Sequence, residues 1–86
     1  MKASHILVST QEQAHAILAE ATAENFASLA QQHSSCPSKA NGGNLGDFGP
    51  GQMVKPFEDA TLATPIGSIS QPVQTQFGYH LIHRTG

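Results

Sequence analysis

The two ends of this chain carry the feature that most restricts its fold, because each holds a short apolar segment with a histidine inside it. Residues 3–8 read Ala-Ser-His-Ile-Leu-Val and contain His5, and residues 79–84 read Tyr-His-Leu-Ile-His-Arg and contain His80. Both segments are rich in the β-branched and aliphatic residues that favour buried strands. A buried histidine needs hydrogen-bond partners for its ring nitrogens, so the fold must supply partners to both.

A single small core is expected, because the chain has only 86 residues. A chain of this size buries about 60% of the surface of its unfolded form, which leaves no room for a second domain. We therefore predict one domain over residues 1–86. One cysteine, Cys36, cannot form an internal disulfide, and neither a signal peptide nor a run of apolar residues long enough for a membrane span is found. These features predict a cytoplasmic protein, and we expect a monomer.

The surface is expected to be polar but weakly charged. Charged residues make up 12% of the chain and the net charge is -2, with no basic cluster. Nucleic acids and anionic membranes attract basic patches, so neither is expected as a partner.

The first half of the chain predicts a strand followed by two helices. Residues 10–13, Thr-Gln-Glu-Gln, fit a capping box, and apolar residues recur at helical spacing from Ala14 to Ala21. A second helix is expected to begin at Asn25, with an apolar stripe that ends at His33, which we expect to pack and to cap the helix.

The second half predicts a long loop, a helix and two strands. Residues 34–51 are rich in glycine, serine and proline and surround a short strand near 45–48. Pro56 fits the first turn of a helix that runs to about Ala63. A brief strand over 69–73, broken by Pro72, and a last strand over 79–84 complete an α+β fold with a small, largely antiparallel sheet.

Metal, phosphate and covalent chemistry are poorly supported by the residues. His33 and Cys36 have no second cysteine beside them, and His80 and His83 should point to opposite faces of their strand. The glycines of 42–46 are not followed by the lysine of a phosphate-binding loop. Cys36 as an attacking nucleophile remains a minor alternative, because Pro37 follows it in a loop rather than at a helix start. We therefore expect no metal and no cofactor.

Three segments taken in order carry a family resemblance over essentially the whole chain. They are ASHILV, SSCPSKANGGNLGDFGPGQMVKPFEDA and TQFGYHLIHRTG, and together they resemble the parvulin family of peptidyl-prolyl cis/trans isomerases. The resemblance implies a four-stranded antiparallel sheet surrounded by three to four helices. It also implies catalysed rotation about X-Pro bonds without a cofactor, with proline-containing peptides and unfolded or folding proteins as partners.

The same resemblance implies the residues of the site. An apolar socket for the proline ring would comprise Leu45, Met53 and Phe57, with Phe48 and Phe77 close by; without the resemblance, Met53 and Phe57 would fit either a core or an exposed groove. A polar network would join His5, Cys36, Thr75 and His80.

Two questions stay open at the level of sequence. Cys36 fits either a polarisable group beside the twisting amide or an inert buried thiol. The fold suits either an isomerase or a non-catalytic peptide-binding module. In the parvulins that require phosphoserine or phosphothreonine before proline, a longer loop after the first strand carries clustered Lys and Arg. This chain has no such cluster there, so the resemblance implies no preference for a phosphorylated residue.

Overall fold

The computed structural model describes residues 1–35 and 40–86. Cys36, for which the sequence predicts a place in the polar network, lies outside the described residues. The elements follow the predicted order of strand, two helices, strand, helix and two strands. They are β1 (Lys2–Val8), α1 (Gln11–Glu20), α2 (Phe26–His33), β2 (Asn44–Asp47), α3 (Lys55–Ala63), β3 (Val73–Thr75) and β4 (Gly78–Arg84).

The four strands form one sheet in the order β2-β1-β4-β3, and every neighbouring pair is antiparallel. The two strands that carry the terminal histidines, β1 and β4, are therefore neighbours at the centre. Their register places His5 opposite Ile82 and Leu7 opposite His80. Because side chains alternate along a strand, all four of these side chains lie on the same face.

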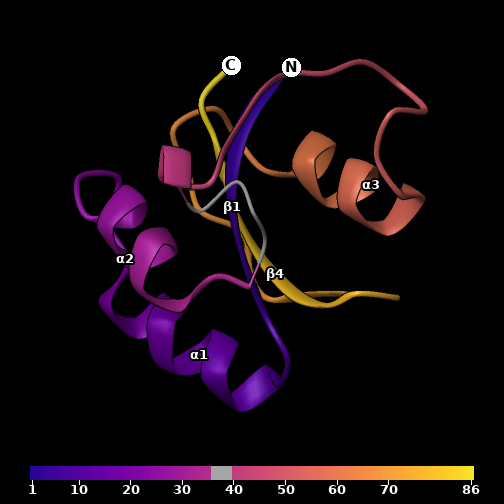
Figure 1. Ribbon diagram of the computed structural model, residues 1–86. Helices are drawn as coiled ribbons and strands as arrows, with labels where there is room; N and C mark the ends of the chain where they lie inside the picture. The colour runs from indigo at the N-terminus through magenta and orange to yellow at the C-terminus, as the bar shows by residue number, and fades with distance from the viewer. Residues whose placement is uncertain (36–39) are drawn as a thin grey trace.

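Helices cover both faces of the sheet, which confirms the predicted α+β class. Figure 1 shows α1 and α2 on one side of the central strands and α3 on the other. The first side holds a core of eight buried residues: Ile6, Val8, Ala14, Ile17, Phe26, Leu29, Ala30 and Leu81. The α3 side holds a smaller core of Ala3, Phe48, Phe57 and Ile82. The histidines His5 and His80 share the face of this smaller core.

The helices begin at or within one or two residues of the positions that the sequence predicts. Thr10 caps α1, because its Oγ1 accepts a hydrogen bond from the Gln13 backbone N–H at 3.2 Å. Asn25 is the N-cap residue of α2, and Pro56 lies in the first turn of α3. One detail of the prediction is wrong: His33 is exposed at the end of α2 rather than packed, because the buried stripe ends one turn earlier at Ala30.

The predicted strand over residues 69–73 is also misplaced. Ile69 forms only an isolated bridge with His83, and the regular strand β3 begins after Pro72, at Val73. Proline has no N–H to donate to a ladder, so regular pairing starts only beyond it. Before it, the Ser70 N–H donates to the Ile82 carbonyl at 2.7 Å, and the Ser70 Oγ accepts from the Ile82 N–H at 3.1 Å.

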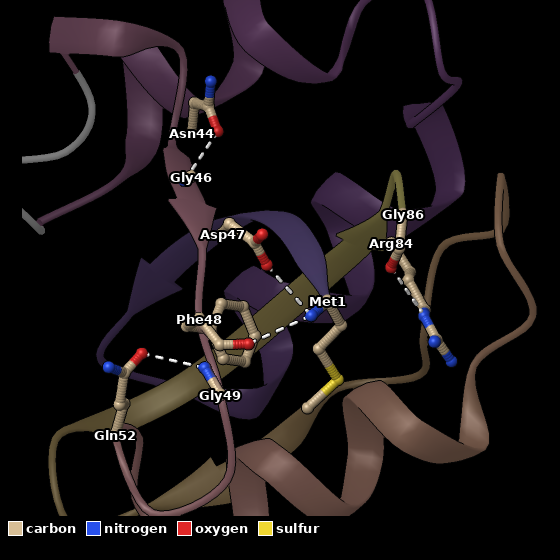
Figure 2. A network of polar contacts seen from close by, with 9 residues as sticks. All are labelled: Met1, Asn44, Gly46, Asp47, Phe48, Gly49, Gln52, Arg84 and Gly86. Atoms are coloured by element: carbon tan, nitrogen blue, oxygen red, sulfur yellow. Dashed lines mark hydrogen bonds and ion pairs between the residues drawn. The ribbon is translucent and has the colours of Figure 1, made fainter.

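Both ends of the chain lie side by side at one edge of the molecule (Figure 1). The Lys2 N–H donates to the carbonyl of Gly86 at 3.1 Å. The Met1 amine donates to Asp47 Oδ1 at 3.1 Å and to the Phe48 carbonyl at 3.0 Å, as Figure 2 shows. Among the described residues, no helix is long and apolar enough to span a membrane.

Candidate active site

A groove of about 490 Å³ opens on the α3 face of the sheet. Its floor comes from β1 and β4, and its walls come from β2, the segment before α3, the first turn of α3 and the β3–β4 turn. Among the lining residues are six that the sequence predicts for the site: His5, Leu45, Met53, Phe57, Phe77 and His80. The sequence left two alternatives for Met53 and Phe57, a place in the core or in an exposed groove. Both hold in part, because each of these side chains lines the groove and also packs in the smaller core.

The two histidines meet at the floor of this groove. Their Nδ1 atoms are 3.0 Å apart, and both side chains are buried. The ring centroids are 5.2 Å apart with planes inclined by 18°, so the rings meet edge to edge in nearly one plane. The expected hydrogen-bonded pairing is therefore present. The pair is diagonal rather than directly opposed across the strands, a distance that aromatic rings can span.

Thr75 extends this pair into a network. Its Oγ1 lies 2.8 Å from His80 Nε2, and the same oxygen accepts a hydrogen bond from the Phe77 N–H at 3.2 Å. The strand β3 and the turn after it thus fix the orientation of the His80 ring. Three of the four predicted network residues, His5, Thr75 and His80, come together, and Cys36 is the one outside the described residues.

Both histidines are neutral at physiological pH. Burial lowers the pKa of His80 from 6.5 to about 4. Burial first, and the neighbouring His80 second, together lower the pKa of His5 from 6.5 to about 4. The charged form is disfavoured because the groove floor offers no water shell and no compensating anion among the described residues.

Neutral rings leave two consistent proton arrangements. In one, Thr75 donates to His80 Nε2 and His80 donates from Nδ1 to His5. In the other, His5 donates from Nδ1 to His80, and His80 donates from Nε2 to Thr75. In each arrangement every shared contact has one donor and one acceptor. The network therefore presents a dry, uncharged but polar floor to whatever enters the groove.

Phe57 links the histidines to the apolar wall. Its ring packs edge-to-face with His5 at a centroid distance of 5.6 Å and with His80 at 5.2 Å. Phe48 differs from the prediction, since it does not line the groove. It is buried, and its ring centroid lies 6.1 Å from that of Phe57, so it supports Phe57 from the core. The substrate-binding role predicted for Phe48 gains no support from this placement.

Four groove residues were not predicted from the sequence: Leu7, Ser35, Gln52 and Val54. Leu7 had a detectable signal, because it lies two residues after His5 on the same strand and must share its face. Gln52 and Val54 flank Met53 in a segment without helix or strand, where no periodicity predicts which side chains turn inward.

No group of three or more His, Cys, Asp or Glu side chains that could hold a metal ion occurs within residues 1–35 and 40–86. His80 and His83 lie on opposite faces, as the sequence predicts, with His83 packed against Phe26 of α2 at a centroid distance of 5.4 Å. The described residues bring to the groove mainly apolar side chains and the polar network of His5, Thr75 and His80.

Comparison with known protein families gives one match, which covers residues 5–86 and is described as a rotamase, PPIC-type peptidyl-prolyl isomerase domain. The chain is 49% identical over 87 residues to the foldase protein PrsA of Geobacillus sp. strain WCH70, covering 99% of this chain and 32% of PrsA. The chain thus spans about a third of the length of this curated relative.

Solved structures show the same similarity in three dimensions. A crystal structure of the peptidylprolyl isomerase PrsA from Bacillus anthracis matches with a TM-score of 0.90 and 44% identity, covering 100% of this chain and 41% of that one. The parvulin NmPin of Nitrosopumilus maritimus matches with a TM-score of 0.86 and 44% identity, covering 100% and 95%. The second match shows that a chain of nearly this extent occurs among the relatives.

Proposed function

The chain belongs to the family of PPIC-type peptidyl-prolyl isomerases, the parvulins, and on that premise we propose that its groove catalyses cis/trans rotation about X-Pro bonds. The substrates would be proline-containing segments of unfolded or folding proteins, in keeping with a relative named a foldase. A cytoplasmic location and a monomeric state remain predictions from the sequence.

The observation that carries this proposal is an apolar groove with a neutral polar floor. Rotation must break the resonance of the amide, a barrier of about 18–20 kcal/mol, but no bond forms or breaks. The planar amide has a charge separation between oxygen and nitrogen that water stabilises, and the twisted amide loses much of it. A groove that removes water and brings no charge therefore favours the twisted form over either planar one.

Leu45, Met53 and Phe57 fit the role of a socket for the pyrrolidine ring. They come from three different segments and line one groove, and the Phe57 ring packs against both histidines. The polar network then lies under the amide rather than under the ring. In this arrangement the histidines shape and dry the site, and neither needs to exchange a proton with the substrate.

We expect Met53→Ala to lower kcat/KM for an X-Pro peptide by about tenfold, because it removes roughly 1.4 kcal/mol of apolar contact with the twisting residue. A protease-coupled assay that times cis-to-trans conversion measures it. Leu62→Ala is the matched control, since Leu62 is 58% exposed on α3 and does not line the groove. Equal kcat/KM values for Met53→Ala and Leu62→Ala would show that this groove does not form the socket for the proline ring.

A non-catalytic peptide-binding module is the second candidate, favoured by a solved structure described as a SurA-like chaperone, of which this chain covers 37%. The same assay separates the two candidates. Wild-type protein that binds a proline peptide without accelerating its isomerisation would be such a module.

Phosphorylation of the residue before proline should bring no gain in turnover. Within the described residues no cation lines the groove, and Lys55, at the start of α3, is 81% exposed and pairs with Asp59 at 3.5 Å. Arg84 donates instead to carbonyl groups at the end of α3, including that of Thr61 at 3.3 Å. A phosphate dianion would meet no preorganised guanidinium there.

The measurement compares Leu-Pro, Ala-Pro, Glu-Pro and phosphoserine-Pro peptides at low and moderate salt. We expect the apolar and small residues to lead at both. A preference of about tenfold for the phosphopeptide at low salt that disappears as salt rises would reveal a basic site and contradict the proposal.

A further inference from the structure

One wall of the groove is a segment without helix or strand that joins β2 to α3. It comprises residues 49–54, Gly-Pro-Gly-Gln-Met-Val, and it contributes Gln52, Met53 and Val54 to the groove. Such a segment has few internal constraints, because it contains two glycines and forms no ladder with the sheet. The position of Met53 therefore depends on its own packing in the smaller core and on side chains that hold the rest of the segment in place.

Two side chains do so. Gln52 closes the segment on itself, since its Oε1 accepts from the Gly49 N–H at 2.8 Å, a contact that Figure 2 shows. Glu58 joins the segment to α3, because its Oε1 accepts from the Gly51 N–H at 2.7 Å. Of these two contacts, only the second connects the wall to a rigid element of the fold.

Glu58 is well placed for this role. It lies in the first turn of α3, directly after Phe57, and its backbone N–H donates to the carbonyl of Val54 at 3.0 Å. The residue thus holds the segment at two points, one through its backbone and one through its carboxylate. The same helix turn carries Phe57 at the groove and the carboxylate that fixes the wall bearing Met53.

We propose that Glu58 is a positioning residue for substrate binding, whose carboxylate fixes the wall 49–54 so that Met53 stands in place beside Phe57 before a proline ring enters. This inference rests on the proposed function of the groove. Glu58 itself does not line the groove. Without the hydrogen bond of the Glu58 carboxylate, residues 49–54 must become ordered when the substrate binds. The entropy lost in that step weakens substrate binding.

The expected signature is therefore a change in KM without a change in kcat. Once the substrate has ordered the wall, the contacts to the twisted amide are the same as in the wild type. Losing one charge-assisted hydrogen bond at an exposed site should raise KM about threefold to tenfold. Turnover at saturating peptide should stay within about twofold.

Three variants separate the reach of the side chain from its charge. Glu58→Asp keeps the charge in the first turn of α3 but is one methylene shorter, so it should raise KM. Glu58→Gln loses the charge but keeps an acceptor at Oε1, so it should raise KM less than Glu58→Asp does. Asp59→Ala removes the neighbouring carboxylate, which is 55% exposed and pairs with Lys55 at 3.5 Å, and should have no effect.

Exchange NMR on a proline peptide over a range of concentrations gives KM and kcat for each variant, and hydrogen exchange of the Gly51 amide reports the contact without reference to activity. We expect faster Gly51 exchange in Glu58→Asp than in the wild type or in Glu58→Gln. Thermal unfolding of each variant shows whether it is folded under the assay conditions, and Glu58→Ala is added as a second variant that also lacks the acceptor.

Each outcome decides the inference. The inference is wrong if KM is unchanged in both Glu58→Asp and Glu58→Ala. It is also wrong if Glu58→Gln raises KM as much as Glu58→Asp does, or if Asp59→Ala has an equal effect. If the wild type binds the peptide but does not turn it over, the proposed isomerase function fails, and the dissociation constants of the same variants then test the role of Glu58.

Discussion

Gly43→Ala should destabilise the protein by more than about 3 kcal/mol, a large share of the 5–15 kcal/mol that a domain of this kind has. Gly43 has a φ of +79°, and a Cβ there would lie 2.2 Å from the carbonyl oxygen of His5 and 3.1 Å from the Ala30 side chain. Its own carbonyl accepts from the His5 N–H at 2.9 Å. The chain cannot relieve the clash without moving away from β1 at the residue that bears the histidine.

The matched control is Gly46→Ala, three residues along the same segment. Gly46 also has a positive φ, +72°, but an added Cβ would meet nothing within 4 Å. The free energy of unfolding of that variant should fall only by the cost of placing alanine in the left-handed conformation, about 1–2 kcal/mol. The difference between the two therefore isolates the close approach to His5.

Urea unfolding of both variants measures the effect, and the isomerase assay on folded protein shows whether the His5 side chain has moved. We expect Gly43→Ala to lose activity even under conditions where it is still folded. Equal stabilities of Gly43→Ala and Gly46→Ala would show that the turn at Gly43 does not approach the His5 carbonyl oxygen closely.

Acid should destabilise the fold between pH 6.5 and about 4. The pKa of both His5 and His80 is lowered from 6.5 to about 4, so over this range the unfolded chain binds protons that the folded one does not. Stability is therefore complete above pH 6.5, falls as the pH drops, and stops falling from this cause below about 4. For one histidine the loss is on the order of 3 kcal/mol.

The Asp47 carboxylate titrates below this pH window. The hydrogen bond from the Met1 amine holds the pKa of Asp47 below its usual value of 3.8, so its contribution is lost only at lower pH. The midpoint of urea unfolding, measured from pH 7.5 to 4, should fall over the pH range in which the histidine pair lowers stability. His15→Leu, which removes an exposed histidine on α1, should leave the dependence unchanged.

His80→Leu provides the decisive comparison. It should be less stable than the wild type at pH 7.5, because His5 and Thr75 each lose a hydrogen-bond contact, but its stability should depend less on pH. A variant with the full acid dependence of the wild type would show that other groups cause it. The neutral floor on which the proposed mechanism depends would then be in doubt.

Much of the fold was predictable, because local patterns specify it. The β-branched and aliphatic residues around His5 and His80 predicted two buried strands, and capping at Thr10 and proline at position 56 predicted where helices begin. Turn chemistry explained the glycines of 42–46, two of which, Gly42 and Gly43, come too close to other atoms for a side chain. These features depend on neighbours a few residues away, which a sequence displays directly.

The site was predictable mainly through the family resemblance, which brought together residues far apart in the chain. From the residues alone, Met53 and Phe57 were as consistent with a core as with a groove. Leu7 was not predicted, although alternation along β1 places it on the same face as His5. The roles predicted for His5, Thr75 and His80 stay predictions, although the structure places the three side chains within hydrogen-bond distance.

Tertiary structure decided the rest. Periodicity assigns a side chain to a face but does not set the register between strands, so only the structure shows that His5 and His80 pair diagonally. The burial of Phe48 depends on how α3 packs against the sheet. The late start of β3 depends on where Pro72 lies relative to β4. The contact between Glu58 and Gly51 joins a helix to a segment without periodicity, and a pattern of residue types cannot specify it, because its distance is fixed only when both elements have packed.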